Sequence, residues 1–239
     1  AARLAAAGFA AGANAVKFQI YFADELLVRR HPRYEHFKRQ SFAPAIWADL
    51  LANTCRQGLV YCDVFGLEAV EVAARHGAAG LKVHSSDTGN EPLLRAVAET
   101  QKTVFLSAGG TTARELASAI EVIGKGSARI VILHGFQNYP TEVGDSGLAR
   151  LDWLRGLFGD RCEIGYMDHV SGDDPFAFHL PLMAVAGGAK VIEKHITLDR
   201  AARGVDYYSS LNPDEFGRFV AAVRQAETAL GEKPDQFVA

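Results

Sequence analysis

The chain has 239 residues, of which 49% are hydrophobic and 22% are charged, and its formal net charge is −3. This composition excludes long disordered segments, and the absence of a basic stripe argues against nucleic acid as a partner. No apolar run reaches the roughly 18 residues of a membrane span, and three cysteines without a CxxC pair predict reduced thiols in a cytoplasmic protein.

Short apolar runs rich in β-forming residues alternate with segments of helical spacing along the chain. Most of the runs are apolar at consecutive positions, which is typical of parallel strands buried on both faces. Steps of roughly 20–45 residues between them leave room for βαβ units and predict a parallel sheet. Seven strands are expected, at residues 15–19, 59–63, 80–83, 103–106, 130–134, 163–167 and 191–195.

Two of the expected helices carry clear boundary signals. Thr112 with Glu115 forms a capping-box pattern, and Gly124 follows the apolar face of that helix as a stop. The last helix opens at Asn212 before a proline, and it is expected to end at Gly231.

The alternation favours a TIM (β/α)₈ barrel, and an open doubly wound sheet is the alternative. Residues 1–8 are expected to form a helix that runs into the first strand. A helix with no strand before it indicates that the seven strands are strands two to eight and that the first strand is missing. No linker or composition shift divides the chain, so residues 1–239 are expected to form one domain, incomplete at its N-terminus.

Polar side chains gather at the carboxyl ends of the predicted strands, where barrels place their active sites. Buried lysines and histidines are costly unless they are paired or used. Their convergence on one rim therefore predicts an anionic ligand and a metal. The candidates at these ends are Lys17, Gln19, Lys82, Ser85, Asp87, Ser107, Gln137, Tyr139, His169 and His195.

Several of these candidates also have a purely structural interpretation. Lys17 and Lys82 can be partners of strand-end carboxylates, and Ser85 and Ser107 can stabilise turns instead of binding a phosphate. A lone histidine is more often a satisfied core residue than a metal ligand.

The two histidines at the ends of adjacent strands point to a metal more strongly than either would alone. His169 and His195 can meet across the mouth of the barrel as ligands of Mn, Fe or Zn. Glu193 can support this pair, and its structural alternative is a partnership with Lys194.

Segments in chain order resemble those of the sialic acid synthase family, which includes synthases for spore coat polysaccharide. The match is collinear from about residue 13 to residue 231, and segment 189–199 follows the family pattern GAKVIEKHFTLD almost throughout. The segments are 13–19 (ANAVKFQ), 82–87 (KVHSSD), 105–110 (FLSAGG), 134–140 (HGFQNYP), 165–169 (GYMDH), 189–199 (AKVIEKHITLD), and 204–206 (GVD) with 210–215 (SLNPDE).

The resemblance implies condensation of phosphoenolpyruvate with an N-acyl hexosamine to a nonulosonic 2-keto acid for surface polysaccharides. It implies a divalent cation, Mn²⁺ or Mg²⁺, held by His169 and His195, and a homodimer. The remaining roles it implies are catalytic for Lys17, Gln19, Lys82 and Asp87, and substrate-binding for Ser85, Ser107, Gln137, Tyr139 and Asp206.

The chain departs from the family pattern at positions that shape the pocket. Met167 stands where the family has a serine and Val170 where it has a threonine, and Gly135, Phe136 and Gln137 replace Cys-Thr-Ser or Cys-Thr-Asn. A first-strand glutamate and a C-terminal antifreeze-like domain, both usual in the family, have no counterpart in the chain. The missing hydroxyls affect phosphate binding and the choice of sugar.

Two alternatives to the synthase stay open. A non-catalytic or altered-substrate barrel of the same family is favoured by Phe136 and Met167. An aldolase with a Schiff base on Lys82 or Lys194 would need no metal.

Overall fold

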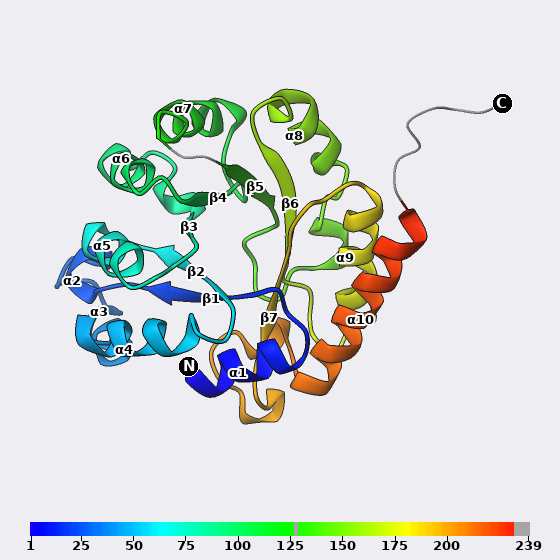
Figure 1. Ribbon diagram of the computed structural model, residues 1–239, viewed down its shortest axis with the longest axis horizontal. Helices are drawn as coiled ribbons and strands as arrows, with labels where there is room; N and C mark the ends of the chain where they lie inside the picture. Colours follow the sequence, from blue (N-terminus) through cyan, green and yellow to red (C-terminus); the bar gives the residue numbers. More distant parts are fainter. Residues whose placement is uncertain (127–128, 232–239) are drawn as a thin grey trace.

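The structure is a computed structural model that describes residues 1–126 and 129–231. Eight parallel strands form one curled, TIM-barrel-like sheet in consecutive order, with the helices outside it (Figure 1). The strands are β1 (Ala15–Ile20), β2 (Leu59–Val64), β3 (Gly80–Val83), β4 (Thr103–Ser107), β5 (Ile130–His134), β6 (Glu163–Asp168), β7 (Ile192–Ile196) and β8 (Ser210–Leu211).

Helices cover the outer face of the sheet between successive strands (Figure 1). The predicted capping box of Thr112 and Glu115 is confirmed, because each side chain bonds the backbone N–H of the other residue. The helices are α1 (Ala2–Ala10), α2 (Ala23–Leu26), α3 (Tyr34–Gln40), α4 (Pro44–Thr54), α5 (Leu67–Arg75), α6 (Glu91–Glu99), α7 (Ala113–Ile123), α8 (Arg150–Phe158), α9 (Phe176–Ala186) and α10 (Pro213–Leu230). No helix in the described ranges has both the length and the apolar character needed to cross a membrane.

All seven predicted strands are confirmed to within a residue or two, but the count of seven is wrong. β8 pairs with β7 through only two residues, too few for any periodic pattern to be visible in the sequence. The consecutive strand order excludes a doubly wound sheet, in which the order reverses. The numbering of the strands as two to eight is not confirmed, and the missing first strand stays a prediction.

The two edges of the sheet, β1 and β8, do not pair with each other in the part of the chain that the structure describes. The helical layer nevertheless continues across this opening, because α1 and α10 contact each other. Phe216 and Phe219 of α10 pack with Leu211 of β8 and with Ala11 and Ala13 near the start of β1. This small apolar cluster holds the edges of the sheet near each other.

Alternation along the strands separates an outer core from the interior of the curl. The outer core lies between the sheet and the helices and contains most of the buried apolar side chains. The interior has its own small apolar layer, formed by Phe105, Val131, Leu133 and Met167 with Tyr61 and Val191 packed against it. The residues that alternate with the outer core beyond this layer are polar or charged, and they form the site described below.

We expect Gly135→Ala to destabilise the protein, because a Cβ at this position would lie 2.3 Å from the carbonyl oxygen of Met167 and 2.4 Å from its Cγ. The backbone oxygen cannot move aside cheaply, so the cost should be about 1–3 kcal/mol, a fall in Tm of several degrees. Thermal unfolding measures it. Gly89→Ala is the control, because nothing lies within 4 Å of its added Cβ. Equal Tm values for the two variants would contradict the tight packing of Gly135 against Met167.

Candidate active site

Four charged side chains from β1, β2, β3 and β7 meet in the interior of the curl, and we call them the ion ring: Lys17, Asp63, Lys82 and Glu193. Lys17 Nζ lies 3.3 Å from Asp63 Oδ2 and 3.4 Å from Glu193 Oε1. Lys82 Nζ lies 2.7 Å from the same Glu193 oxygen and 3.8 Å from Asp63 Oδ2. Each lysine therefore faces both carboxylates, and cations alternate with anions around the ring.

Lys17 and Glu193 stay ionised in spite of their burial, because the opposite charges of the ring outweigh its cost. Burial by itself would lower the pKa of Lys17, but the carboxylates of Glu193 and Asp63 outweigh it and raise the pKa above its usual value. Burial would likewise raise the pKa of Glu193, yet the ammonium groups of Lys17 and Lys82 hold that pKa well below its usual range. Lys17 therefore stays positively charged and Glu193 negatively charged.

A chain of hydrogen bonds runs from β4 toward the mouth of the curl. Ser107 Oγ, which is fully buried, accepts a bond of 3.0 Å from Gln137 Nε2. The hydroxyl of Tyr139 donates to Gln137 Oε1 at 3.0 Å, and burial raises the pKa of Tyr139 to about 12. The structure thus brings together Ser107, Gln137 and Tyr139, three of the predicted substrate-binding residues.

Met167 fills the interior beside this chain. Its Sδ lies 3.6 Å from Lys82 Nζ and 3.7 Å from Ser107 Oγ. The side chain is 1% exposed and belongs to the interior apolar layer. A thioether therefore stands between a buried ammonium group and a buried hydroxyl.

The predicted histidine pair also lies at the mouth, with the ring centroids of His169 and His195 5.4 Å apart and the ring of Tyr139 4.4 Å from that of His169. His169 Nδ1 lies 2.9 Å from the carbonyl oxygen of Phe136, so this nitrogen donates and leaves Nε2 with a free lone pair. Burial lowers the pKa of both rings, to about 3 for His195, where nearby His169 also contributes. Both imidazoles are therefore neutral, as metal ligands must be.

Among the described residues, few side chains near the histidine pair could act as further metal ligands. Asp206 Oδ2 lies 3.9 Å from His195 Nδ1, which is too far for a hydrogen bond. Within the described ranges, no group of three or more His, Cys, Asp and Glu side chains is placed to hold a metal ion. Two neutral imidazole nitrogens are compatible with a cation whose other ligands are substrate or water atoms. Because the described part of the protein supplies only these two nitrogens here, a bound metal is a proposal.

Three predicted site residues lie apart from the ion ring. Gln19 is exposed at the end of β1, opposite Asp63 in the strand register. Asp87 accepts hydrogen bonds from its neighbours Ser86 and Asn90, which is turn chemistry, and Ser85 lies in the same turn. In the described part of the chain, none of the three has a side-chain hydrogen bond to the ring, and their catalytic and binding roles stay predictions.

Sequence reasoning missed two members of the ring. Asp63 was not a candidate, although it ends a buried strand two residues after Tyr61 and so lies on the interior face. Glu193 was considered only as a support for the histidines or a partner of Lys194. Lys194 instead forms a buried ion pair with Asp168, while Glu193 faces the interior.

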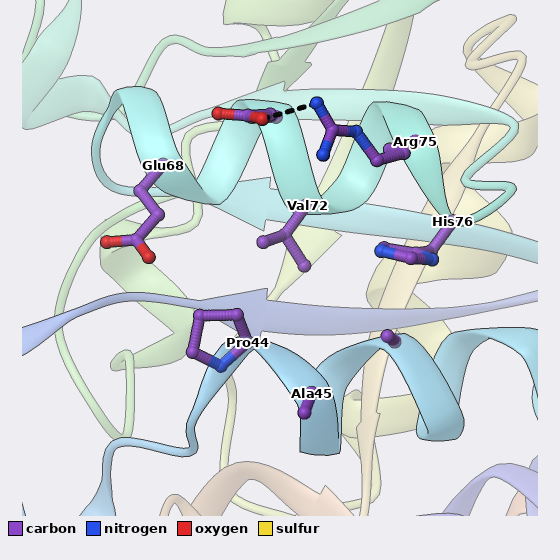
Figure 2. Close-up of a pocket in the computed structure, with 8 residues that line it drawn as sticks. Pro44, Ala45, Glu68, Val72, Arg75 and His76 are labelled. Carbon is purple, nitrogen blue, oxygen red and sulfur yellow. Dashed lines mark ion pairs between the residues drawn. The ribbon is translucent and has the colours of Figure 1, made fainter.

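A separate hollow lies in the helical layer between α4 and α5 (Figure 2). Val72 of α5 and His76, which directly follows α5, line one wall, and Pro44 and Ala45 of α4 line the other. An ion pair between Glu71 and Arg75 runs along α5 (Figure 2). It shares no residue with the ion ring or the histidine pair. Its walls carry only the ordinary chemistry of a helix surface, and we assign it no role.

A curled parallel sheet with paired lysines and carboxylates in its interior and neutral histidines at its mouth defines a barrel-type protein. The chain belongs to the NeuB family, whose model matches residues 4–235. The resemblance to the sialic acid synthases is thereby confirmed.

Known relatives agree with this assignment. The chain is 32% identical to a pseudaminic acid synthase of Campylobacter jejuni over 93% of its own length and 67% of the relative's. A crystal structure of N-acetylneuraminic acid synthetase from Leptospira borgpetersenii, in complex with citrate, superposes with a TM-score of 0.89 at 29% identity, covering 100% of this chain and 81% of that one. The spore coat polysaccharide biosynthesis protein SpsE of Bacillus subtilis gives 0.82 at 31% identity, covering 96% and 64%.

The chain spans only part of the length of the curated relatives it matches. It covers 64% of a protein from Methanocaldococcus jannaschii, 67% of the pseudaminic acid synthase and 49% of an N,N'-diacetyllegionaminic acid synthase from Campylobacter jejuni. The similarity therefore does not establish the activity, substrates or partners of the whole protein, and we treat them as proposals.

We predict that Lys82→Met will lower the free energy of unfolding by about 3–5 kcal/mol, because it leaves two buried carboxylates with one lysine. The double variant Lys82→Met/Glu193→Gln removes one charge of each sign and should recover a large part of this loss. Urea unfolding of the wild type, both single variants and the double variant measures the coupling. Additive losses would show that Lys82 and Glu193 do not interact as described.

Proposed function

We propose that the chain condenses phosphoenolpyruvate with an N-acyl hexosamine to give a nonulosonic, sialic-acid-like 2-keto acid for surface polysaccharides. The observation that carries this proposal is the convergence of Lys17 and Lys82 in the interior, with the neutral pair His169 and His195 at its mouth. The relatives named as pseudaminic, legionaminic and sialic acid synthases support the same reaction class.

In the proposed reaction, C3 of phosphoenolpyruvate forms a bond to the aldehyde carbon of the open-chain sugar. Water adds at C2, and inorganic phosphate leaves. Lys17 and Lys82 hold the carboxylate and the phosphate as point charges, and the carboxylates of the ion ring keep Lys17 protonated. Ser107 and Gln137 offer neutral hydrogen bonds beside the lysines.

We propose that a divalent cation, Mn²⁺ or Mg²⁺, binds to His169 and His195. When bound there, it supplies a Lewis acid toward the sugar aldehyde. The hydrogen bond from His169 Nδ1 to the carbonyl oxygen of Phe136 fixes the ring so that Nε2 can ligate. The ring of Tyr139 lies 4.4 Å from that of His169 and 6.1 Å from that of His195 and so forms one side of the proposed cation site.

The remaining expectations belong to the same proposal. Gln19 and Asp87 are the remaining candidates for catalytic residues, and Ser85 and Asp206 are the remaining candidates for substrate contacts. A homodimer is expected from the resemblance, and a cytoplasmic location is expected from the three unpaired cysteines. The non-catalytic alternative keeps the barrel and the ion ring but predicts no turnover.

We expect phosphate release from phosphoenolpyruvate that depends on both manganese and an N-acyl hexosamine. It should fall at least about 100-fold in the double variant His169→Ala/His195→Ala, because this variant lacks the proposed ligands of the cation that would polarise the aldehyde. The assay uses the full-length protein and a panel of sugars. His179→Ala is the control, because this histidine lies on α9, away from the mouth. Release unchanged in the double variant would refute the assigned roles, and no release on any sugar by a folded wild type would favour the non-catalytic alternative.

We predict no covalent adduct when the protein is treated with pyruvate and borohydride. A Schiff base needs a neutral, accessible amine, whereas Lys82 is bound to Glu193 at 2.7 Å and Lys194 is buried against Asp168 on the other face of its strand. Mass spectrometry of the intact protein provides the readout. A mass increase on either lysine would instead establish the aldolase alternative.

A further inference from the structure

Asp63 is the member of the ion ring with the least complete set of contacts. The residue is 1% exposed, and its Oδ2 lies 3.3 Å from Lys17 Nζ and 3.8 Å from Lys82 Nζ. Its other oxygen, Oδ1, is buried and has no hydrogen-bond partner among the described residues. A buried carboxylate oxygen without a donor is costly, so the two lysines must balance that cost.

The second carboxylate of the ring is held more tightly. Glu193 Oε1 lies 2.7 Å from Lys82 Nζ, a charge-assisted hydrogen bond of ordinary length. It also lies 3.4 Å from Lys17 Nζ. An incoming anion that needs the lysines will therefore displace the contacts of Asp63 more readily than those of Glu193.

The charge balance of the ring bears directly on ligand binding. Two carboxylates neutralise the two lysines, so the ring as a whole offers an anion no net positive charge. An anion can bind only if its own attraction to Lys17 and Lys82 exceeds its repulsion by Asp63 and the loss of that residue's contacts.

We propose that Asp63 is a specificity-determining residue, an internal counter-anion that competes with the anionic substrate for Lys17 and Lys82. It weakens the binding of every anion, and the penalty grows with the charge of the ligand. The inference rests on the proposed function in one respect, that phosphoenolpyruvate is the anion. Beyond the proposed function, the inference says that phosphoenolpyruvate binds less tightly to this chain than it would if Lys17 and Lys82 were not paired with Asp63.

The test compares the binding of phosphoenolpyruvate, inorganic phosphate and pyruvate to the wild type and to Asp63→Asn by calorimetry, without sugar. Asparagine keeps the shape of the side chain and removes its charge. Phosphoenolpyruvate should bind to Asp63→Asn on the order of tenfold tighter or more. The gain should be smaller for phosphate and smallest for pyruvate, in the order of their charges.

Asp152→Asn is the matched control, because this carboxylate is 80% exposed on α8 and its removal should leave all three affinities unchanged. Asp63→Ser is a second neutral variant with the same expected gain, in case the asparagine protein does not fold. Equal or weaker binding of phosphoenolpyruvate by the folded neutral variant would overturn the proposal.

This outcome is distinguishable from a failure of the proposed function. The binding comparison involves no turnover, so tighter binding in Asp63→Asn supports the role of Asp63 even if no sugar releases phosphate. Conversely, sugar-dependent phosphate release by the wild type together with unchanged binding in Asp63→Asn would retain the synthase and reject the counter-anion.

Discussion

The contact between Lys82 and Glu193 joins β3 to β7 across the interior of the curled sheet, and the rest of the site is arranged around it. A buried lysine at the centre of a sheet is tolerable only with a carboxylate in contact, and here one carboxylate serves Lys82 at 2.7 Å and Lys17 at 3.4 Å. The apolar layer that contains Phe105 and Met167 lies on one side of this pair, and the two histidines lie on the other side, at the mouth. Along the interior of the curl, toward the mouth, apolar side chains are thus followed by charged ones and then by neutral polar ones.

The sequence was sufficient for most of the sheet, because seven strands are continuous apolar runs whose length and spacing fit few structures besides a parallel sheet. It was insufficient for β8, because a strand of two residues is too short to show a pattern of alternating hydrophobic and polar residues. The site was predicted in the same uneven way. Lysines and histidines are conspicuous in apolar runs, so Lys17, Lys82, His169 and His195 were found, whereas Asp63 was interpreted as the end of a strand. Its interior position follows from alternation along β2, two residues after Tyr61, and the strand pairing places it opposite Gln19 and Lys82.

The departures from the family pattern acquire a physical meaning in the structure. Met167 occupies the space between Lys82 and Ser107, and Gly135 has no room for a side chain because the backbone and Cγ of Met167 lie against it. The two positions are thus coupled through packing. Gln137, a third departure, is the residue that links Ser107 to Tyr139. The residues that depart from the family pattern therefore contact one another or share the partner Ser107, and these contacts cannot be inferred from any one of the positions alone.

The contacts that complete the curl join parts of the chain that are far apart in sequence. Lys82 and Glu193 are separated by 111 residues, and the hydrogen bond from Arg224 to Asn14 spans 210. Loop-closure entropy opposes such contacts more strongly than it opposes contacts between residues close in sequence. Without β7, Lys17, Lys82 and Asp63 lack Glu193, the second carboxylate of the ion ring. The charges of the ion ring are therefore balanced only when β7 is in place, because Glu193 supplies the second negative charge of the ring.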